Sequence, residues 1–175
     1  MSGKNILMVI APDKFRDEEL NHPRQVFKQA GESVTVASTR KGEAVGMLGH
    51  REKVDYDLND VAGKTFDAVV VVGGAGAQTS LWGVSALHDI LRRHHQMGKV
   101  VAAICLSGAV LAKAGLLKGI PATVWKSDES LSVYTEHGVN FQDKPVVRSG
   151  KIVTAQGPFA AREFGQEVVS ALEED

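Results

Sequence analysis

The stretch KVVAAICLSGAVLAKAG (99–115) passes directly from a continuous apolar run into a helical pattern. Such a run is typical of a parallel strand, because helices cover both faces of a parallel sheet. Three other segments share this character and are expected to lie in the same sheet: NILMVIA (5–11), VTVAS (34–38) and DAVVVVGG (67–74). The alternation of such runs with longer amphipathic segments predicts an α/β fold.

The amphipathic segments between these runs predict helices on both faces of the sheet. The expected helices are 17–30, 80–97, 106–114 and 159–173. Close to the end of the chain, Ser149-Gly150 lies between two β-rich runs and indicates a tight hairpin. We therefore expect residues 1–175 to form a single domain, a three-layer α/β/α sandwich with a flavodoxin-like, mostly parallel sheet and a C-terminal β-hairpin.

Composition limits the classes of function. Lys+Arg of 20 against Asp+Glu of 21 leaves a net charge of -1, so no basic field attracts nucleic acid, and no nucleic acid partner is expected. The apolar run near the N-terminus is too short to span a membrane and lacks a signal-peptide cleavage site, so we expect a cytoplasmic protein without a membrane partner. A single cysteine excludes an internal disulfide and a Cys-rich zinc site, and neither a metal nor a cofactor is expected.

That cysteine, Cys105, ends the strand of the opening stretch. Small residues around it, Ala103, Ser107 and Gly108, allow a sharp strand-to-helix turn of the nucleophile-elbow type, although the G-x-S-x-G pattern itself is absent. The N-terminus of the following helix is expected to lower the pKa of the thiol and favour the reactive thiolate. The local pattern is equally compatible with a buried cysteine of the core.

Two further segments carry residues suited to chemistry. Gly73-Gly74 follows a run of valines, and free backbone amides there are suited to hold an oxyanion. In the expected helix 17–30, a rotation of about 100° per residue places Glu19 on the apolar face and points Asp17 and Glu18 away from it. A carboxyl group there is costly unless partnered, so Glu19 either faces a polar pocket or lies at the rim. Pro23 predicts that the helix begins or kinks near it.

Four motifs in order give the chain a resemblance to the ThiJ/PfpI superfamily, whose fold is similar to that of class I glutamine amidotransferase domains. The motifs are FRDEELNHP, DAVVVVGGAGAQ, AAICLSGAVLAKAGLLKG and TAQGPFAAREFGQEVVSAL. The resemblance implies that Cys105 is the nucleophile and that Glu19, four residues before a proline, hydrogen-bonds its sulfur. It also implies that the backbone amides of Gly74 and Leu106 form an oxyanion hole, and that the protein is a homodimer.

The chain departs from the family at the histidines. Members assigned peptidase activity carry a histidine directly after the cysteine, where this chain has Leu106, and others carry one after a V-T-T strand, where it has Trp125. Trp125 is a candidate wall of the pocket. His22, one turn after Glu19, is a candidate substitute at the border of the apolar face. His94 is expected at the edge of the core, and no HExxH pattern supports a metal site at the other histidines.

Two functions follow from the resemblance. The first is Cys-dependent attack on a small reactive carbonyl, of the glyoxalase or deglycase kind, with Glu19 as the proton carrier. Peptidase activity is the less expected version, because the histidine base is missing. The alternative is a redox sensor or stress-response, chaperone-like protein, in which peroxide converts Cys105 to a sulfinate beside a protonated Glu19. The absence of both histidines favours this alternative, and a purely structural cysteine remains a third interpretation.

Overall fold

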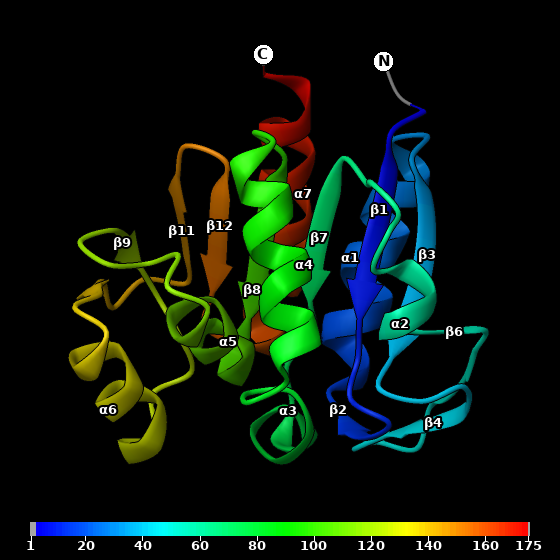
Figure 1. The fold of residues 1–175 in the computed structure, drawn as a ribbon, viewed down its shortest axis with the longest axis horizontal. Helices are drawn as coiled ribbons and strands as arrows, with labels where there is room; N and C mark the ends of the chain where they lie inside the picture. Colours follow the sequence, from blue (N-terminus) through cyan, green and yellow to red (C-terminus); the bar gives the residue numbers. More distant parts are fainter. Residues whose placement is uncertain (1–2, 175) are drawn as a thin grey trace.

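A central sheet of seven strands organises the molecule, of which the computed structural model describes residues 3–174 (Figure 1). The strands, in spatial order, are β11 (Val146–Ser149), β12 (Ile152–Ala155), β8 (Val100–Ile104), β7 (Ala68–Val71), β1 (Asn5–Val9), β3 (Ser33–Ser38) and β6 (Tyr56–Asp57). Neighbouring strands are parallel except β11 and β12, which form an antiparallel hairpin through Gly150, whose φ is +59°. The mostly parallel sheet and its C-terminal hairpin are confirmed.

Helices cover both faces of this sheet, as the strand pattern predicts. On one face α1 (Asp17–Gln29) packs against α7 (Ala161–Glu173), and on the other lie α2 (Leu58–Val61), α4 (Ser85–Gln96) and α5 (Gly108–Lys113) (Figure 1). Alternate residues of β1 enter the two cores: Ile6 and Met8 join the cluster under α1 and α7, whereas Leu7 and Val9 join the other. The three-layer sandwich is therefore confirmed.

Helix α1 corrects the expectation that the helix begins near Pro23, because it runs from Asp17 to Gln29 with Pro23 inside it. A proline inside a helix loses one backbone hydrogen bond, which packing must offset. The packing partner here is α7: a Cβ on Gly165 would lie 3.1 Å from the Cα of Pro23, so a glycine on α7 permits close contact of the two helices.

Two other expected helices also differ in detail. The helix expected at 80–97 begins only at Ser85, as α4, and it is preceded by a turn that contains Gly83 and by a separate short helix, α3 (Ala75–Ser80), that was not expected. The segment expected as 106–114 begins with a 3₁₀ turn, η1 (Cys105–Ser107), before α5. A tight 3₁₀ turn is common at a helix N-terminus, and here it turns the chain sharply after β8.

Several elements have no counterpart in the sequence prediction. A second sheet joins β2 (Asp13–Phe15), β4 (Gly42–Gly46) and β5 (Arg51–Val54), with β4 and β5 antiparallel. Beyond α5 lie β9 (Pro121–Ala122), α6 (Asp128–Glu136) and β10 (Asn140–Phe141), and η2 (Pro158–Ala160) precedes α7. The second sheet matters for function, because β2 leads into α1 and the turn after β4 reaches the carboxyl ends of the main strands.

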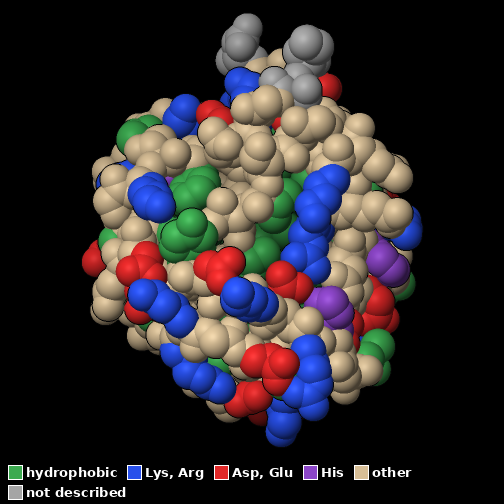
Figure 2. Space-filling model, turned by 90° about the vertical axis from the view of Figure 1, so that its right-hand side faces the viewer, with side chains coloured by type: hydrophobic (Ala, Val, Ile, Leu, Met, Phe, Trp, Pro, Cys, Tyr) green, Lys and Arg blue, Asp and Glu red, His purple; other side chains and the backbone are tan. Residues whose placement is uncertain are grey.

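The surface carries charges of both signs. Figure 2 shows Lys and Arg side chains interspersed with Asp and Glu, with hydrophobic side chains between them, on the side of the molecule where β3 lies near the sheet edge. Val34 and Val36 of β3, with Arg24, Lys28 and Glu52, are among the residues that line a hollow of about 340 Å³ there. Within residues 3–174, no helix has the length and apolar character that crossing a membrane requires.

Candidate functional site

Cys105 occupies a strained turn at the carboxyl end of β8. Its φ is +63°, in the left-handed region that non-glycine residues adopt at a cost of about 1 kcal/mol or more. Three hydrogen bonds hold the turn: Ser107 Oγ donates to the Val72 carbonyl at 2.7 Å, Trp82 Nε1 donates to the Leu106 carbonyl at 2.8 Å, and the Trp125 amide donates to the Cys105 carbonyl at 3.2 Å. The backbone geometry is therefore that of a nucleophile elbow.

The glycine pair after β7 allows the chain to approach this elbow closely. A Cβ on Gly73 would lie 2.5 Å from Glu19 Oε1 and 2.6 Å from Cys105 Cβ, so any side chain there would separate the carboxyl group from the cysteine. Gly74 has a φ of +109°, which favours glycine. Its backbone amide and that of Leu106 face the sulfur of Cys105, and each acts to lower the pKa of the thiol. The structure thus brings together the four residues that the resemblance assigns to the site.

Glu19 lies beneath the elbow with none of its side chain exposed, as its place on the apolar face of α1 predicts. Neither carboxyl oxygen has a hydrogen-bond partner of good geometry among the described residues. The Cys105 thiol and the Gly73 amide face the carboxyl group, and each lowers its pKa. Burial outweighs them and raises the pKa of Glu19 to about 8, so the carboxyl group is mostly protonated at neutral pH.

The structure contradicts the expectation that the elbow lowers the pKa of the thiol. Burial raises the pKa of Cys105, and a charged Glu19 would raise it further, whereas the amides of Gly74 and Leu106 act in the opposite direction. The cause is desolvation, since Cys105 is only 7% exposed. The repulsion from Glu19 disappears when that group is protonated, so the two side chains titrate as one coupled pair.

A pocket of about 240 Å³ opens over the cysteine. Its lining residues are Arg16, Met47, Gly74, Ala75, Cys105, Leu106, Trp125 and Pro158. Trp125 is 43% exposed and packs over Gly157, where a Cβ would lie 2.9 Å from the indole ring. The candidate wall at Trp125 thus lies in the pocket, which is narrow and mainly apolar.

Two residues near this pocket were missed. Asp17, expected to point away from the apolar face of the helix, is nevertheless buried, and its carboxylate accepts hydrogen bonds from the amides of Leu48 and His50 at 2.9 and 2.8 Å. These bonds hold the turn that places Met47 in the pocket, where its sulfur accepts a hydrogen bond from the Ala75 amide at 3.4 Å. Arg16 was also missed, although it lies inside the motif that contains Glu19. No local pattern marks Asp17, since its partners lie about thirty residues further along the chain.

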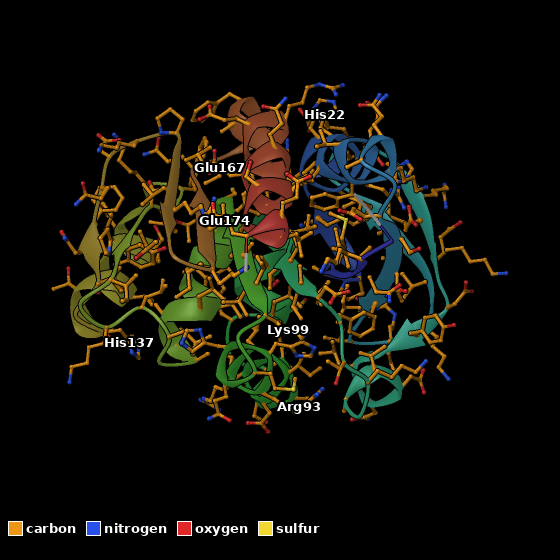
Figure 3. The ribbon with its side chains drawn as sticks, turned by 90° about the horizontal axis from the view of Figure 1, so that it is seen from above. His22, Arg93, Lys99, His137, Glu167 and Glu174 are labelled. Carbon is orange, nitrogen blue, oxygen red and sulfur yellow. The ribbon has the colours of Figure 1, made fainter. Side chains whose placement is uncertain are left out.

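No histidine is among the described residues that line the pocket over the cysteine. His22 is half-buried, projects outward from α1 in Figure 3 and is not among the residues that line the pocket. His137, which follows α6, lies in a distant part of the molecule in the same view. His94 is fully buried: its Nε2 accepts a hydrogen bond from the Phe66 amide at 3.0 Å and its Nδ1 contacts the Ile90 carbonyl at 2.8 Å. Among the described residues, no three His, Cys, Asp or Glu side chains form a metal-binding group.

Comparisons with known proteins cover nearly the whole chain. Residues 4–171 match the model of the DJ-1/PfpI family. An uncharacterized protein of Methanocaldococcus jannaschii is 44% identical over 175 residues, which are 100% of this chain and 85% of that protein. The deglycase PfpI of Pyrococcus furiosus is 31% identical, over 95% of this chain and 98% of the relative. The crystal structure of a ThiJ/PfpI domain protein from Brachyspira murdochii has a TM-score of 0.91 at 35% identity, over 98% of each chain.

Proposed function

Because this chain belongs to the DJ-1/PfpI family, we propose that it is a cysteine-dependent enzyme that acts on small reactive carbonyl compounds, of the glyoxalase or deglycase kind. The observation that carries the proposal is the arrangement of Glu19 and Cys105. A buried carboxyl group with a pKa of about 8 lies against a thiol at the base of a pocket, and two backbone amides point at the sulfur. An acid that is protonated near neutral pH can give and take back a proton during a reaction.

The first step of the proposed reaction is addition to an aldehyde. The Cys105 thiolate attacks the carbonyl carbon, and the electron pair of the C=O bond moves to the oxygen, which the amides of Gly74 and Leu106 stabilise. Glu19 donates its proton to this oxyanion and becomes a carboxylate. The product of this step is a neutral hemithioacetal, and the one proton shared by the pair now lies on the substrate.

A 2-oxoaldehyde then allows an internal rearrangement. The Glu19 carboxylate removes the proton from the carbon bonded to sulfur and returns it to the neighbouring carbon. The hydroxyl proton of the hemithioacetal moves to the neighbouring carbonyl oxygen, so a C=O bond forms at the carbon bonded to sulfur, the neighbouring C=O becomes C–OH, and the product is a thioester of a 2-hydroxy acid. Water hydrolyses this thioester, releases the 2-hydroxy acid and restores the thiol. The net reaction adds one water to the 2-oxoaldehyde and requires neither an oxidant nor a cofactor.

The lining of the pocket supports the small-carbonyl assignment over a peptidase. None of its described residues is a histidine, so no imidazole base assists attack on an unactivated amide. General acid-base help is worth about 10²- to 10⁴-fold, and an aldehyde is reactive enough to need less of it.

The same observation favours a second candidate, a redox sensor. In that role two molecules of peroxide each give one oxygen to Cys105 and leave as water, and a protonated Glu19 donates a hydrogen bond to the sulfinate.

Consumption of methylglyoxal tests the first candidate. We expect the purified protein to convert methylglyoxal to lactate, and the Cys105→Ser variant to lose this activity because an alcohol in that position lacks a nucleophilic thiolate. A His22→Gln variant is the matched control and should retain the activity, since His22 lies outside the pocket. Equal consumption by the wild type and Cys105→Ser would rule out the enzyme. In that case a gain of two oxygens at Cys105 under mild peroxide would identify the sensor.

A further inference from the structure

Arg16 gives the pocket over Cys105 a charge that the proposed reaction does not use. Within the described part of the chain, it is the one Lys, Arg, Asp or Glu among the residues that line this pocket. The remaining lining is apolar, apart from the cysteine itself and the backbone of Gly74. A lone cation in such surroundings is a strong determinant of what binds, because an apolar wall screens charge poorly.

The backbone holds Arg16 close to the reacting groups. Its amide donates to the Gly73 carbonyl at 2.9 Å, and its carbonyl accepts from the Glu19 amide at 3.0 Å. These two backbone hydrogen bonds fix Arg16 beside Gly73 and Glu19. The charge of Arg16 is also coupled to both reacting side chains: the pKa of Arg16 is raised mainly by its hydrogen bond to Glu18 and in smaller part by the charges of Glu19 and Cys105, and Arg16 in turn opposes the rise that burial causes in the pKa of Glu19.

Glu18 orients the guanidinium of Arg16 but bonds only some of its N–H groups. The Glu18 carboxylate accepts from Arg16 Nε at 2.8 Å and from Nη2 at 3.1 Å, which fixes the plane of the group. Glu18 itself does not line the pocket, and Nη1 of Arg16 has no acceptor among the described residues. An arginine held on one edge by a carboxylate is preorganised to bind a second anion through the other.

We propose that Arg16 makes this site selective for carbonyl compounds that carry a carboxylate or another anionic group within a few bonds of the aldehyde. The carbonyl oxygen would face the amides of Gly74 and Leu106, and the anionic group would bind Nη1 of Arg16. This inference deepens the proposed function and rests on it for turnover. Selective entry of anions can be measured without turnover.

Alkylation of Cys105 by a matched pair of reagents measures that selectivity directly. Iodoacetate and iodoacetamide differ by one charge and have nearly the same size, and both transfer a two-carbon group to the thiolate with loss of iodide. At pH 9 we expect the ratio of the iodoacetate rate to the iodoacetamide rate to fall about tenfold in Arg16→Gln, and Arg16→Lys to restore part of it. Glu18→Gln keeps Arg16 and removes its counter-charge, so the ratio should rise. An unchanged ratio in Arg16→Gln, or a cysteine inert to both reagents, would overturn the proposal.

Turnover of a matched pair of substrates then shows whether a failure belongs to the anion site or to the proposed function. The substrates are 4,5-dioxopentanoate, a 2-oxoaldehyde with a carboxylate, and its neutral methyl ester. In Arg16→Gln we expect kcat/KM for the acid to fall about tenfold further than kcat/KM for the ester, because only the acid can pair with the guanidinium, whereas loss of the Arg16 charge beside Glu19 and Cys105 acts on both substrates alike. Equal losses for both substrates would contradict anion selectivity. If the wild type consumes neither substrate but the alkylation ratio depends on Arg16, the proposed function fails and the anion site stands.

Discussion

The pair formed by Glu19 and Cys105 is the central feature at the scale of single residues. Burial disfavours the charged form of both groups, so at neutral pH the pair carries two protons and no charge. Loss of the first proton leaves one negative charge, which lies either on the Glu19 carboxylate or on the Cys105 sulfur. Reactivity therefore depends on the fraction of this charge that lies on sulfur, which belongs to the pair and to neither residue alone.

This coupling predicts a specific pH dependence for the alkylation of Cys105 by iodoacetamide. In the wild type the rate should rise through about pH 8, where the pair loses its first proton, and rise again at higher pH. In Glu19→Gln the step near pH 8 should vanish and leave a single rise at higher pH, because only the buried thiol still titrates. Stopped-flow or mass measurements of the alkylation rate from pH 6 to 11 give both profiles.

Superimposable profiles for the two proteins would show that Glu19 and Cys105 do not interact. Leu106→Ala is a useful companion variant, because it shortens a side chain beside the thiol and keeps the backbone amide that faces the sulfur. We expect that variant to retain the step near pH 8. Loss of the step in both variants would point to a general disturbance of the elbow.

At the scale of elements, the first turn of α1 combines several roles in four consecutive residues. Arg16 lines the pocket, Asp17 holds the turn at Met47, Glu18 orients Arg16, and Glu19 faces Cys105. Consecutive residues of a helix point in directions about 100° apart, so one turn can serve the pocket, a neighbouring loop and the buried thiol at once. This turn is the structural link between the second sheet and the elbow.

Asp17→Asn tests this link. The amide that replaces the carboxylate has an N–H group in place of one oxygen, so it cannot accept both hydrogen bonds from Leu48 and His50, and one partly buried backbone donor loses its partner. We expect the free energy of unfolding to fall by about 1–3 kcal/mol, measured by urea denaturation. Asp89→Asn is the control, because Asp89 is 74% exposed and its ion pair with Arg92 contributes little, about 0–1 kcal/mol. Equal effects of the two variants would contradict the assigned role of Asp17.

The elements also show which features a single sequence can predict. The buried strands are predicted to within a few residues, since continuous apolar runs reflect burial on both faces. Glu19 is predicted on the buried face of α1 from helical angles alone. Asp17 is not, because its burial depends on a turn at Leu48 and His50 that pairs with it only in the folded chain. The strands β4 and β5 are short and partly exposed, and therefore lack the hydrophobic pattern that identifies the main sheet.

The raised thiol pKa was unpredictable for a similar reason. The position of Cys105 before a helix suggests a lowered pKa, and the two amides at the sulfur act in that direction. Desolvation depends on how completely Gly73, Glu19 and the neighbouring strands enclose the sulfur, which is a property of the assembled fold. The prediction of a lowered pKa was therefore wrong, because desolvation by the folded chain outweighs the backbone amides at the sulfur.

For the whole molecule, the buried Glu19 couples stability to pH. Its pKa is about 8 in the folded protein and about 4.5 in the unfolded chain, so between these values the folded state binds a proton that the unfolded state has released. The stabilisation from this proton is complete below about pH 4.5 and is lost as the pH rises through 8. The loss amounts to at most about 1.4 kcal/mol per pH unit.

Comparison of the wild type with Glu19→Gln isolates this contribution. Other carboxyl groups, such as Glu52 beside Arg24, have a lowered pKa and gain stability as the pH rises through the acid range, but they are present in both proteins and cancel in the difference. Urea denaturation at pH 5, 6, 7 and 8 should show that Glu19→Gln becomes progressively more stable than the wild type, by a few kcal/mol in total between pH 5 and 8. A difference that stays constant with pH would mean that Glu19 is ionised in the folded protein, and it could not then donate the proton that the proposed reaction requires. The buried carboxyl group of Glu19 therefore lowers the free energy of unfolding at neutral pH relative to its value at acid pH, and in the proposed function the same group is the proton donor beside the cysteine.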